Sequence, residues 1–311
     1  MKVVLLSLSI GCAVLTSPPV DRVDVTRLDG PNPAVSFHTI DRADPFAWDA
    51  ILSLYEDYGA AMITSQNLPE GMSPSDWAQN VHTSWYPDGE ALGIGLADRL
   101  LAPDAPAYVL IDELKSDTAA EVGDAAIYLR DHHPELAGRW GAYLVNGPSV
   151  SYAALQPALD TLLDADAVIL PEMYVSRAEY CASGASAGSR DAWLAAFFAG
   201  DDQGFPSRFR YLNQRWTAVG SASHLSPVFG VTDSYMTGTG PSVFLDRMFY
   251  VWKTRSGFPS YTTAENGGPS AWKWDQPYLS NTSRDLAFRE SFEHYALDGS
   301  TSSRLGQVTC P

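Results

Sequence analysis

Short apolar runs alternate with longer amphipathic segments along most of the chain. We expect about seven of the runs to be strands, and they are nearly continuous in apolar residues, as strands are when both faces of a sheet are covered. They are AVSFHTID (34–41), GAAMITSQN (59–67), PAYVLIDELKSD (106–117), RWGAYLVNG (139–147), AVILPEMY (167–174), SPVFGVTDSYM (226–236) and PSYTTAENGG (259–268). The segments between them show helical spacing and helix caps. One of these is SPSDWAQNVHTSW (73–85), which we expect to form a helix from Ser73 or Ser75.

Strands that alternate with helices predict βα units and a mainly parallel sheet. The turn FHTIDRADP contains no glycine, which argues against a dinucleotide-binding fold. We expect a single-domain α/β fold, a (β/α)8 TIM-like barrel over 34–311, with one of its eight units hidden in the pattern. An extended lead-in at 18–33 precedes it. A signal peptide is expected at 1–17, where Lys2 is followed by an apolar stretch from Val3 to Leu15.

Charge and cysteine content narrow the class of protein. The net charge is −17, from 37 acidic and 20 basic residues. Because phosphate contacts require Lys or Arg, we expect no nucleic-acid partner. No later segment reaches the roughly 18 apolar residues of a membrane helix, so we expect no membrane span. The signal peptide predicts a secreted protein. We further expect a monomer without cofactor or metal. If Cys12 leaves with the signal peptide, Cys181 and Cys310 remain, and we expect them to form a disulfide.

Polar residues stand at the end of nearly every expected strand. In a βα barrel the carboxyl ends of all strands open onto one face, which carries the active site. An acid there can instead cap the next helix, but such caps normally lie one to three residues further on. The residues expected to ring this face are Asp41, Gln66, Glu113, Asn146, Glu172, Asp233 and Glu265.

Two of these acids suit hydrolysis of a glycosidic bond. That reaction needs one protonated carboxyl group for the leaving oxygen and one carboxylate to attack or to activate water. Alternation puts Glu113 on the strand face of Val109 and Ile111, and Asp112 on the other face. We expect Glu113 to be the acid and Glu172 the nucleophile or base, with Asp112 and Asp233 as substitutes. Asp112 could also anchor the adjacent loop.

Aromatic residues in expected loops would supply the rest of the site. Flat rings beside hydrogen-bonding groups suit sugars, which present C–H faces and hydroxyl edges. The segment GGPSAWKWDQPY (267–278) is expected to be a substrate-lining loop. Together with the polar strand ends, the expected substrate-binding residues are Asp41, Asp112, Asn146, Tyr174, Asp233, Tyr235, Glu265, Trp272 and Trp274.

Three features define the layout of the chain: the signal segment, the acids at strand ends and the aromatic segment. In this layout it resembles the secreted (β/α)8-barrel glycoside hydrolases over about residues 34 to 297. The resemblance implies a single catalytic barrel that cleaves a polysaccharide or oligosaccharide. The Asn-Glu pair that ends strand four in many retaining barrels is absent, because YLVNG has the Asn without the Glu.

Two other functions stay open. A barrel phosphodiesterase could use His38 and His82 with Asp41, Glu113 and Glu172, although the chain has no His-x-His or His-Glu-x-x-His spacing. A non-catalytic carbohydrate-binding surface protein is the other alternative, because a fold does not determine an activity.

Overall fold

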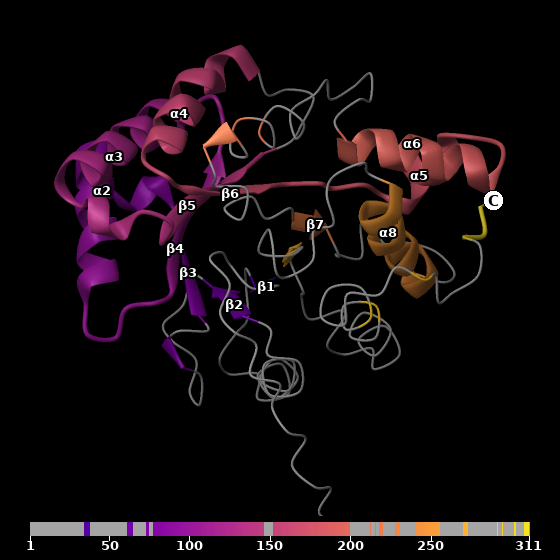
Figure 1. Cartoon of the computed structure of the whole chain (residues 1–311), viewed down its shortest axis with the longest axis horizontal. Coiled ribbons are helices and arrows are strands. Elements are labelled where there is room, and N and C mark those ends of the chain that lie inside the picture. Colours follow the sequence, from indigo (N-terminus) through magenta and orange to yellow (C-terminus); the bar gives the residue numbers. More distant parts are fainter. Residues whose placement is uncertain are drawn as a thin grey trace, which may run out of the picture.

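The chain forms a mixed α/β structure around one parallel sheet (Figure 1). The computed structural model describes residues 34–37, 61–64, 73–74, 77–145, 152–199, 212, 215, 218–219, 228–230, 241–255, 270–272, 291, 294, 302 and 308–310. The expected signal peptide and lead-in lie outside these residues.

Within the described residues, the sheet has eight strands, and every strand pair is parallel. Their order across the sheet is β6-β5-β4-β3-β2-β1-β8-β7. The strands are β1 (Ala34–Phe37), β2 (Ala61–Thr64), β3 (Trp77–Val81), β4 (Tyr108–Leu114), β5 (Trp140–Leu144), β6 (Val168–Pro171), β7 (Val228–Gly230) and β8 (Ser270–Trp272). The predicted parallel α/β architecture is confirmed.

The two outermost strands of this order, β6 and β7, also approach each other. Glu172, just after β6, forms a single parallel bridge with Val228 in β7. The backbone N–H of Met173 donates to the carbonyl oxygen of Val228 at 2.7 Å. One isolated bridge therefore connects β6 and β7, the strands at the two ends of the sheet order.

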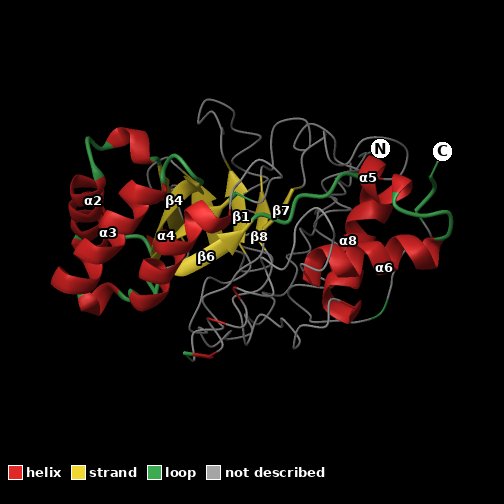
Figure 2. Cartoon of the chain, turned by 90° about the horizontal axis from the view of Figure 1, so that it is seen from above, coloured by secondary structure: helices red, strands yellow, loops and turns green. Residues whose placement is uncertain are grey.

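The described helices form two groups (Figures 1 and 2). One group flanks the strands β3–β6, and the other lies at the opposite end of the molecule. The first group is α2 (Gly89–Leu101), α3 (Ala119–His132) and α4 (Tyr152–Asp164). The second is α5 (Arg177–Ala182), α6 (Ala187–Ala199) and α8 (Pro241–Arg255).

Helix α2 shows how the first group covers the sheet. The side chain of Asp88 accepts a hydrogen bond from the backbone N–H of Ala91 at 2.8 Å, which caps the free N–H groups of the first turn. Leu92, Leu96 and Leu100 recur at helical spacing and are buried against the sheet. Apolar burial at these positions holds the helix in place.

Strand β3 lies where we expected a helix. Residues 77–81 pair with both β2 and β4, and only a short 3₁₀ helix, Thr83–Trp85, follows. The serines and Pro74 resemble a helix start, but the five-residue strand completes hydrogen bonds on both of its edges. Tertiary pairing overrides the local propensity, and β3 supplies the unit that the sequence pattern hides.

Strand β8 also corrects the sequence analysis. Residues 270–272 pair with β1 and β7, within the segment 267–278 that we expected to be a loop. The strand expected at 259–268 lies outside the described residues.

The second helix group contains a buried polar cluster. The hydroxyl of Tyr180 donates to Oδ1 of Asp191 at 2.8 Å, and Nε of Arg247 lies 3.3 Å from the same oxygen. Tyr180 and Asp191 are both almost fully buried. Their mutual contacts join α5, α6 and α8.

A disulfide ties the end of the chain to this group. Cys181 in α5 is bonded to Cys310, with 5.4 Å between the two Cα atoms, so the predicted pairing is confirmed. Arg177 also donates to the carbonyl oxygen of Thr309, next to the disulfide. Among the helices of the described part, none has the length and apolar content of a membrane span.

Candidate active site at the carboxyl ends of the strands

The sheet has two unlike faces. On one face, Val109 and Ile111 are buried among apolar residues of α2–α4. On the other, Leu110 packs with Tyr143 and Leu170, in a cluster whose described members all belong to strands or follow them directly. We call this second face the far face. Since side chains alternate along a strand, it comprises Ala78, Asn80, His82, Tyr108, Leu110, Asp112, Gly141, Tyr143, Val168, Leu170 and Glu172.

Asp112 and His82 meet at the carboxyl ends of β4 and β3. Oδ2 of Asp112 lies 3.0 Å from Nδ1 of His82, with 12% of the Asp112 side chain and 38% of the His82 side chain exposed. His82 has an extended backbone, φ −101° and ψ 139°, so it continues the row of Ala78 and Asn80. The contact confirms that both side chains lie on the far face.

The row of Val109 and Ile111 does not lie on the far face. We expected the row of Val109 and Ile111 to lead to the site, but both residues are buried against the helices. A register shift between Ile111 and Leu114 interrupts the alternation at this point. The structure describes the backbone of Glu113 but not its side chain, so its catalytic role stays a prediction. Asp112 is the carboxylate of β4 whose described contacts lie at this edge.

Glu172 lies immediately after β6. The strand ends at Pro171, as the missing N–H of proline predicts. The backbone N–H of Glu172 still donates to the carbonyl oxygen of Leu144 at 3.0 Å, which fixes the residue to β5. Val168 and Leu170 belong to the far-face cluster, so Glu172 continues their row, and it is 9% exposed.

Three tyrosines belong to the far face or pack against it, two of them toward the carboxyl ends of the strands and Tyr108 at the start of β4. Tyr143 is part of the far-face cluster, and Tyr108 and Tyr174 pack against it. Tyr174, which we expected to bind substrate, is therefore partly buried beside Glu172 in the chain. Gly141 belongs to this face as well, and a Cβ there would lie 1.8 Å from the carbonyl oxygen of Val168. Glycine at 141 thus permits β5 and β6 to approach.

The sequence analysis overlooked the contribution of β3. Asn80 lies on the far face in register with Leu110 of β4, and it is 1% exposed. Neither its amide oxygen nor its amide nitrogen has a hydrogen-bond partner in the structure as described. Trp85 is 52% exposed, and its ring centroid lies 4.9 Å from that of His82. The alternation of Trp77, Gln79 and Val81 with Ala78, Asn80 and His82 is the signal that could have revealed these residues.

Several predicted site residues lie partly or wholly outside the described residues. The backbone of Trp272 lies in β8, and its side chain is not described. The others lie outside the described residues: Asp41, Asn146, Asp233, Tyr235, Glu265 and Trp274. Their roles stay predictions.

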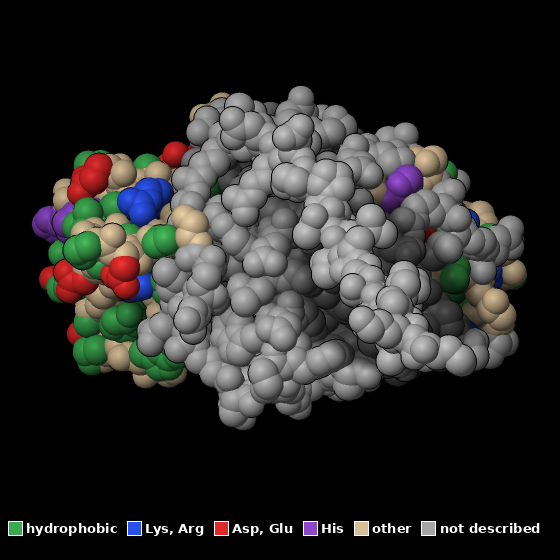
Figure 3. Space-filling view, turned by 90° about the horizontal axis from the view of Figure 1, so that it is seen from below, with side chains coloured by type: hydrophobic (Ala, Val, Ile, Leu, Met, Phe, Trp, Pro, Cys, Tyr) green, Lys and Arg blue, Asp and Glu red, His purple; other side chains and the backbone are tan. Residues whose placement is uncertain are grey.

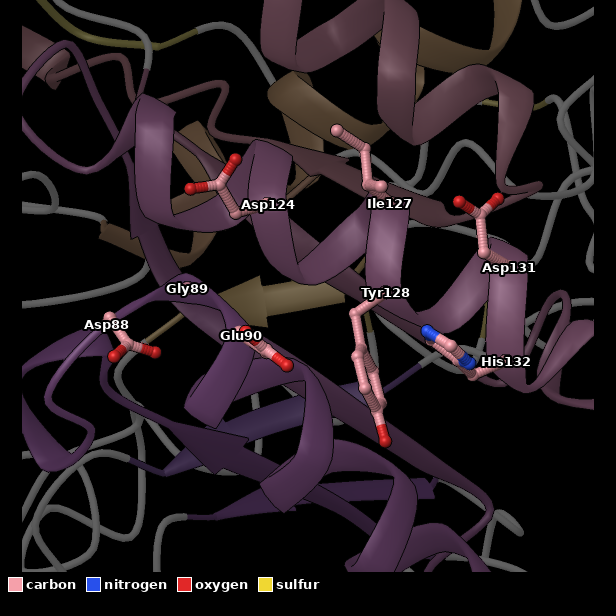
Figure 4. Close-up of a pocket in the computed structure, with 8 residues that line it drawn as sticks. All are labelled: Asp88, Gly89, Glu90, Asp124, Ile127, Tyr128, Asp131 and His132. Carbon is pink, nitrogen blue, oxygen red and sulfur yellow. The ribbon is translucent and has the colours of Figure 1, made fainter.

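A hollow of about 390 Å³ lies elsewhere, between the start of α2 and the outer side of α3 (Figure 4). Asp88, one of its acids, already caps α2. The rings of Tyr128 and His132 lie 4.7 Å apart along α3. Figure 3 shows acidic, basic and histidine side chains scattered over this end of the molecule, as on a solvated helix surface. The lining residues are Asp88, Gly89, Glu90, Asp124, Ile127, Tyr128, Asp131 and His132.

Comparisons with known proteins do not place the chain in a family. No family model matches its sequence, and no curated protein matches it either. Among solved structures, it is similar to one described as the catalytic core of xylanase A. The TM-score is 0.35 and the identity 12%, over 81% of this chain and 90% of that chain. A likeness this distant decides neither the fold nor the function.

Proposed function

We propose that the protein is a glycoside hydrolase whose two working carboxylates come from the ends of β4 and β6. The observation that carries the proposal is the position of Asp112 and Glu172. Asp112 lies near the carboxyl end of β4 and Glu172 directly after β6, on the sheet face that α2–α4 do not cover, which also carries Tyr143 and Tyr174. This is the edge at which α/β proteins place catalytic groups.

The proposal includes a closed barrel. We infer that the sheet closes between β6 and β7, and the bridge from Glu172 to Val228 supports this. In a closed barrel the far face is the interior, and its side chains converge at the mouth. Asp112 and Glu172 would then face a common space at the carboxyl ends of the strands.

The chemistry requires two different roles. One carboxyl group gives its proton to the leaving oxygen, while the other attacks the anomeric carbon or removes a proton from the attacking water. The backbones of β4 and β6 are two strand spacings apart, roughly 10 Å. From that distance, the Asp112 and Glu172 side chains can reach either about 5 Å, for retention, or about 9 Å, for inversion. Glu113 is the alternative acid on β4.

Hydrolysis of a polysaccharide panel tests the proposal. The purified chain is compared with three isosteric variants, Glu172→Gln, Asp112→Asn and Glu113→Gln, each checked for an unchanged melting temperature. We expect wild type to release reducing ends, and Glu172→Gln to lose at least about a hundredfold, the effect of removing an acid or base. The β4 variant with the larger loss identifies the second carboxylate. A wild type inert on every substrate contradicts the proposal.

The contact between His82 and Asp112 favours a second candidate. A histidine held by a carboxylate at 3.0 Å can act as a general base, as a phosphodiesterase of this architecture would need. A chromogenic phosphodiester, assayed with and without chelator, tests it. Turnover that His82→Ala abolishes would favour this candidate over the glycoside hydrolase.

We also propose that the protein is exported. The disulfide Cys181–Cys310 supports this, because such bonds persist in oxidising compartments. Fractionation of cells that express the full chain tests it, and mature protein retained in the cytoplasm contradicts it.

A further inference from the structure

We propose that the end of β3 forms a saccharide-binding subsite beside Asp112, with Asn80, His82 and Trp85 as its contact residues. The proposal rests on the proposed function, since it assigns to that site the residues that would hold one sugar unit. It adds residues that the strand-end pattern did not reveal, because β3 lies where a helix was expected.

Trp85 presents an exposed ring on a fixed backbone. The backbone N–H of Trp85 donates to the carbonyl oxygen of His82 at 3.1 Å, at the short 3₁₀ helix. The next residue, Tyr86, turns instead toward the core, and burial raises the pKa of its hydroxyl. Of these two adjacent aromatic rings, the chain thus partly buries Tyr86 and leaves Trp85 exposed beside the site. A rigid ring of this kind suits stacking on the C–H face of a sugar.

His82 links this ring to the carboxylate. It packs against Trp85 on one side and pairs through Nδ1 with Asp112. Since a carboxylate only accepts hydrogen bonds, Nδ1 carries a proton, and Nε2 is left for a sugar hydroxyl, which can both donate and accept. A sugar stacked on Trp85 would therefore meet a hydrogen-bonding ring nitrogen next to the carboxylate.

Asn80 supplies an independent observation. It is 1% exposed, and both of its amide atoms are without a hydrogen-bond partner within the described structure. A buried amide without partners destabilises the fold relative to an apolar side chain of similar size. Asn80 lies two residues before His82 on the far face, where its amide can bind a ligand hydroxyl, directly or through water.

A binding assay tests the subsite independently of catalysis. The probes are xylan, mixed-linkage β-glucan, galactomannan, starch and glycol chitin, in affinity electrophoresis with the full chain. The variants are Trp85→Ala and Trp85→Phe, with Leu101→Ala as a matched control. Leu101 is 53% exposed and lies at the end of α2, on the connection to the start of β4 and so toward the opposite strand edge.

We expect wild type to bind at least one probe and Trp85→Ala to weaken that binding at least tenfold. Trp85→Phe should retain part of the affinity, and Leu101→Ala all of it. Undiminished binding by Trp85→Ala overturns the subsite, as does binding of none of the probes.

Asn80→Leu gives a second test with a readout besides activity. If Asn80 serves only the fold, Leu lowers the melting temperature or leaves everything unchanged. If it binds substrate, the variant melts at the same or a higher temperature and binds the same probe at least tenfold more weakly. Unaltered binding removes Asn80 from the subsite.

The two proposals fail in different ways. Binding that depends on Trp85, in a wild type that hydrolyses no probe, keeps the subsite and contradicts the glycoside hydrolase. Hydrolysis that Glu172→Gln abolishes and Trp85→Ala leaves unchanged, in both KM and kcat, keeps the enzyme and overturns the subsite.

Discussion

Polar side chains on the two faces of β3 and β4 differ in their hydrogen-bond partners. On the face toward α2, Oε1 of Gln79 accepts a hydrogen bond from Nε of Arg99 at 2.7 Å, and the guanidinium of Arg99 lies 5.0 Å from the centroid of the Trp77 ring. On the far face, Asn80 is buried without a partner in the described structure, and Asp112 meets a half-exposed histidine. Gln79 therefore serves the packing of a helix. Among the described residues, the buried amide of Asn80 has no such role in packing.

Adjacent residues of β4 give the largest expected contrast. Ile111→Ala removes a buried side chain between the sheet and the helices, and we expect it to lower the free energy of unfolding by about 2–5 kcal/mol. Asp112→Asn should change that free energy by less than about 1 kcal/mol and slow hydrolysis about a hundredfold or more. Denaturant unfolding and initial rates measure the two effects. An Asp112→Asn variant that is as unstable as Ile111→Ala and fully active would remove the distinction between the faces.

A buried polar group with partners should behave unlike Asn80. We expect Tyr180→Phe to lower the free energy of unfolding by about 1.5–3 kcal/mol, because the hydroxyl donates to the buried carboxylate of Asp191. Burial, and then the bond to Asp191, raises the pKa of Tyr180 above its ordinary value of 10.0. Below pH 10 its contribution to stability is fully present. Above pH 10 the unfolded chain loses the proton first, so stability falls as the pH rises.

Unfolding at pH 8 and between pH 10 and 11 checks this account. The loss of stability across that interval should be smaller in Tyr180→Phe than in wild type. Tyr86, whose pKa burial also raises, contributes in both proteins and does not affect the difference. An equal alkaline loss in the two proteins would contradict the role given to Tyr180.

The smallest expected effects on the free energy of unfolding are those of substitutions at Gln79 and Asn80. Gln79→Leu leaves Nε of Arg99 without its acceptor, and we expect a loss of about 1 kcal/mol with unchanged hydrolysis. Asn80→Leu removes an amide without partners and should be neutral or stabilise by up to about 1 kcal/mol. The comparison requires only melting curves. If both substitutions destabilise equally, Asn80 has structural partners like those of Gln79.

The sequence predicts the parallel architecture well because apolar strands and amphipathic helices differ in period. Val168, Ile169 and Leu170 could hardly be anything but a buried strand, and Cys181 with Cys310 leaves one economical pairing. Residues 77–81 were misassigned because their strand is short and its hydrogen bonds are all to distant segments.

The site was harder to predict than the fold. Strand alternation correctly puts Asp112 on the opposite face from Ile111, but it does not say which face the helices cover. That depends on the packing of Val109 and Ile111 against α2–α4. The register shift after Ile111 is also invisible in the sequence. Asn80 becomes a site candidate, and His82 a neighbour of Asp112, only once β3 is recognised as a strand.

The most direct test of the central claim is the initial rate at which Glu172→Gln hydrolyses the best substrate of the wild type, at matched melting temperature. We predict a loss of at least about a hundredfold, because the substitution keeps the shape of the side chain and removes its acid–base chemistry. A Glu172→Gln variant that folds like wild type and hydrolyses at the wild-type rate would contradict the assignment of catalysis to this edge of the sheet.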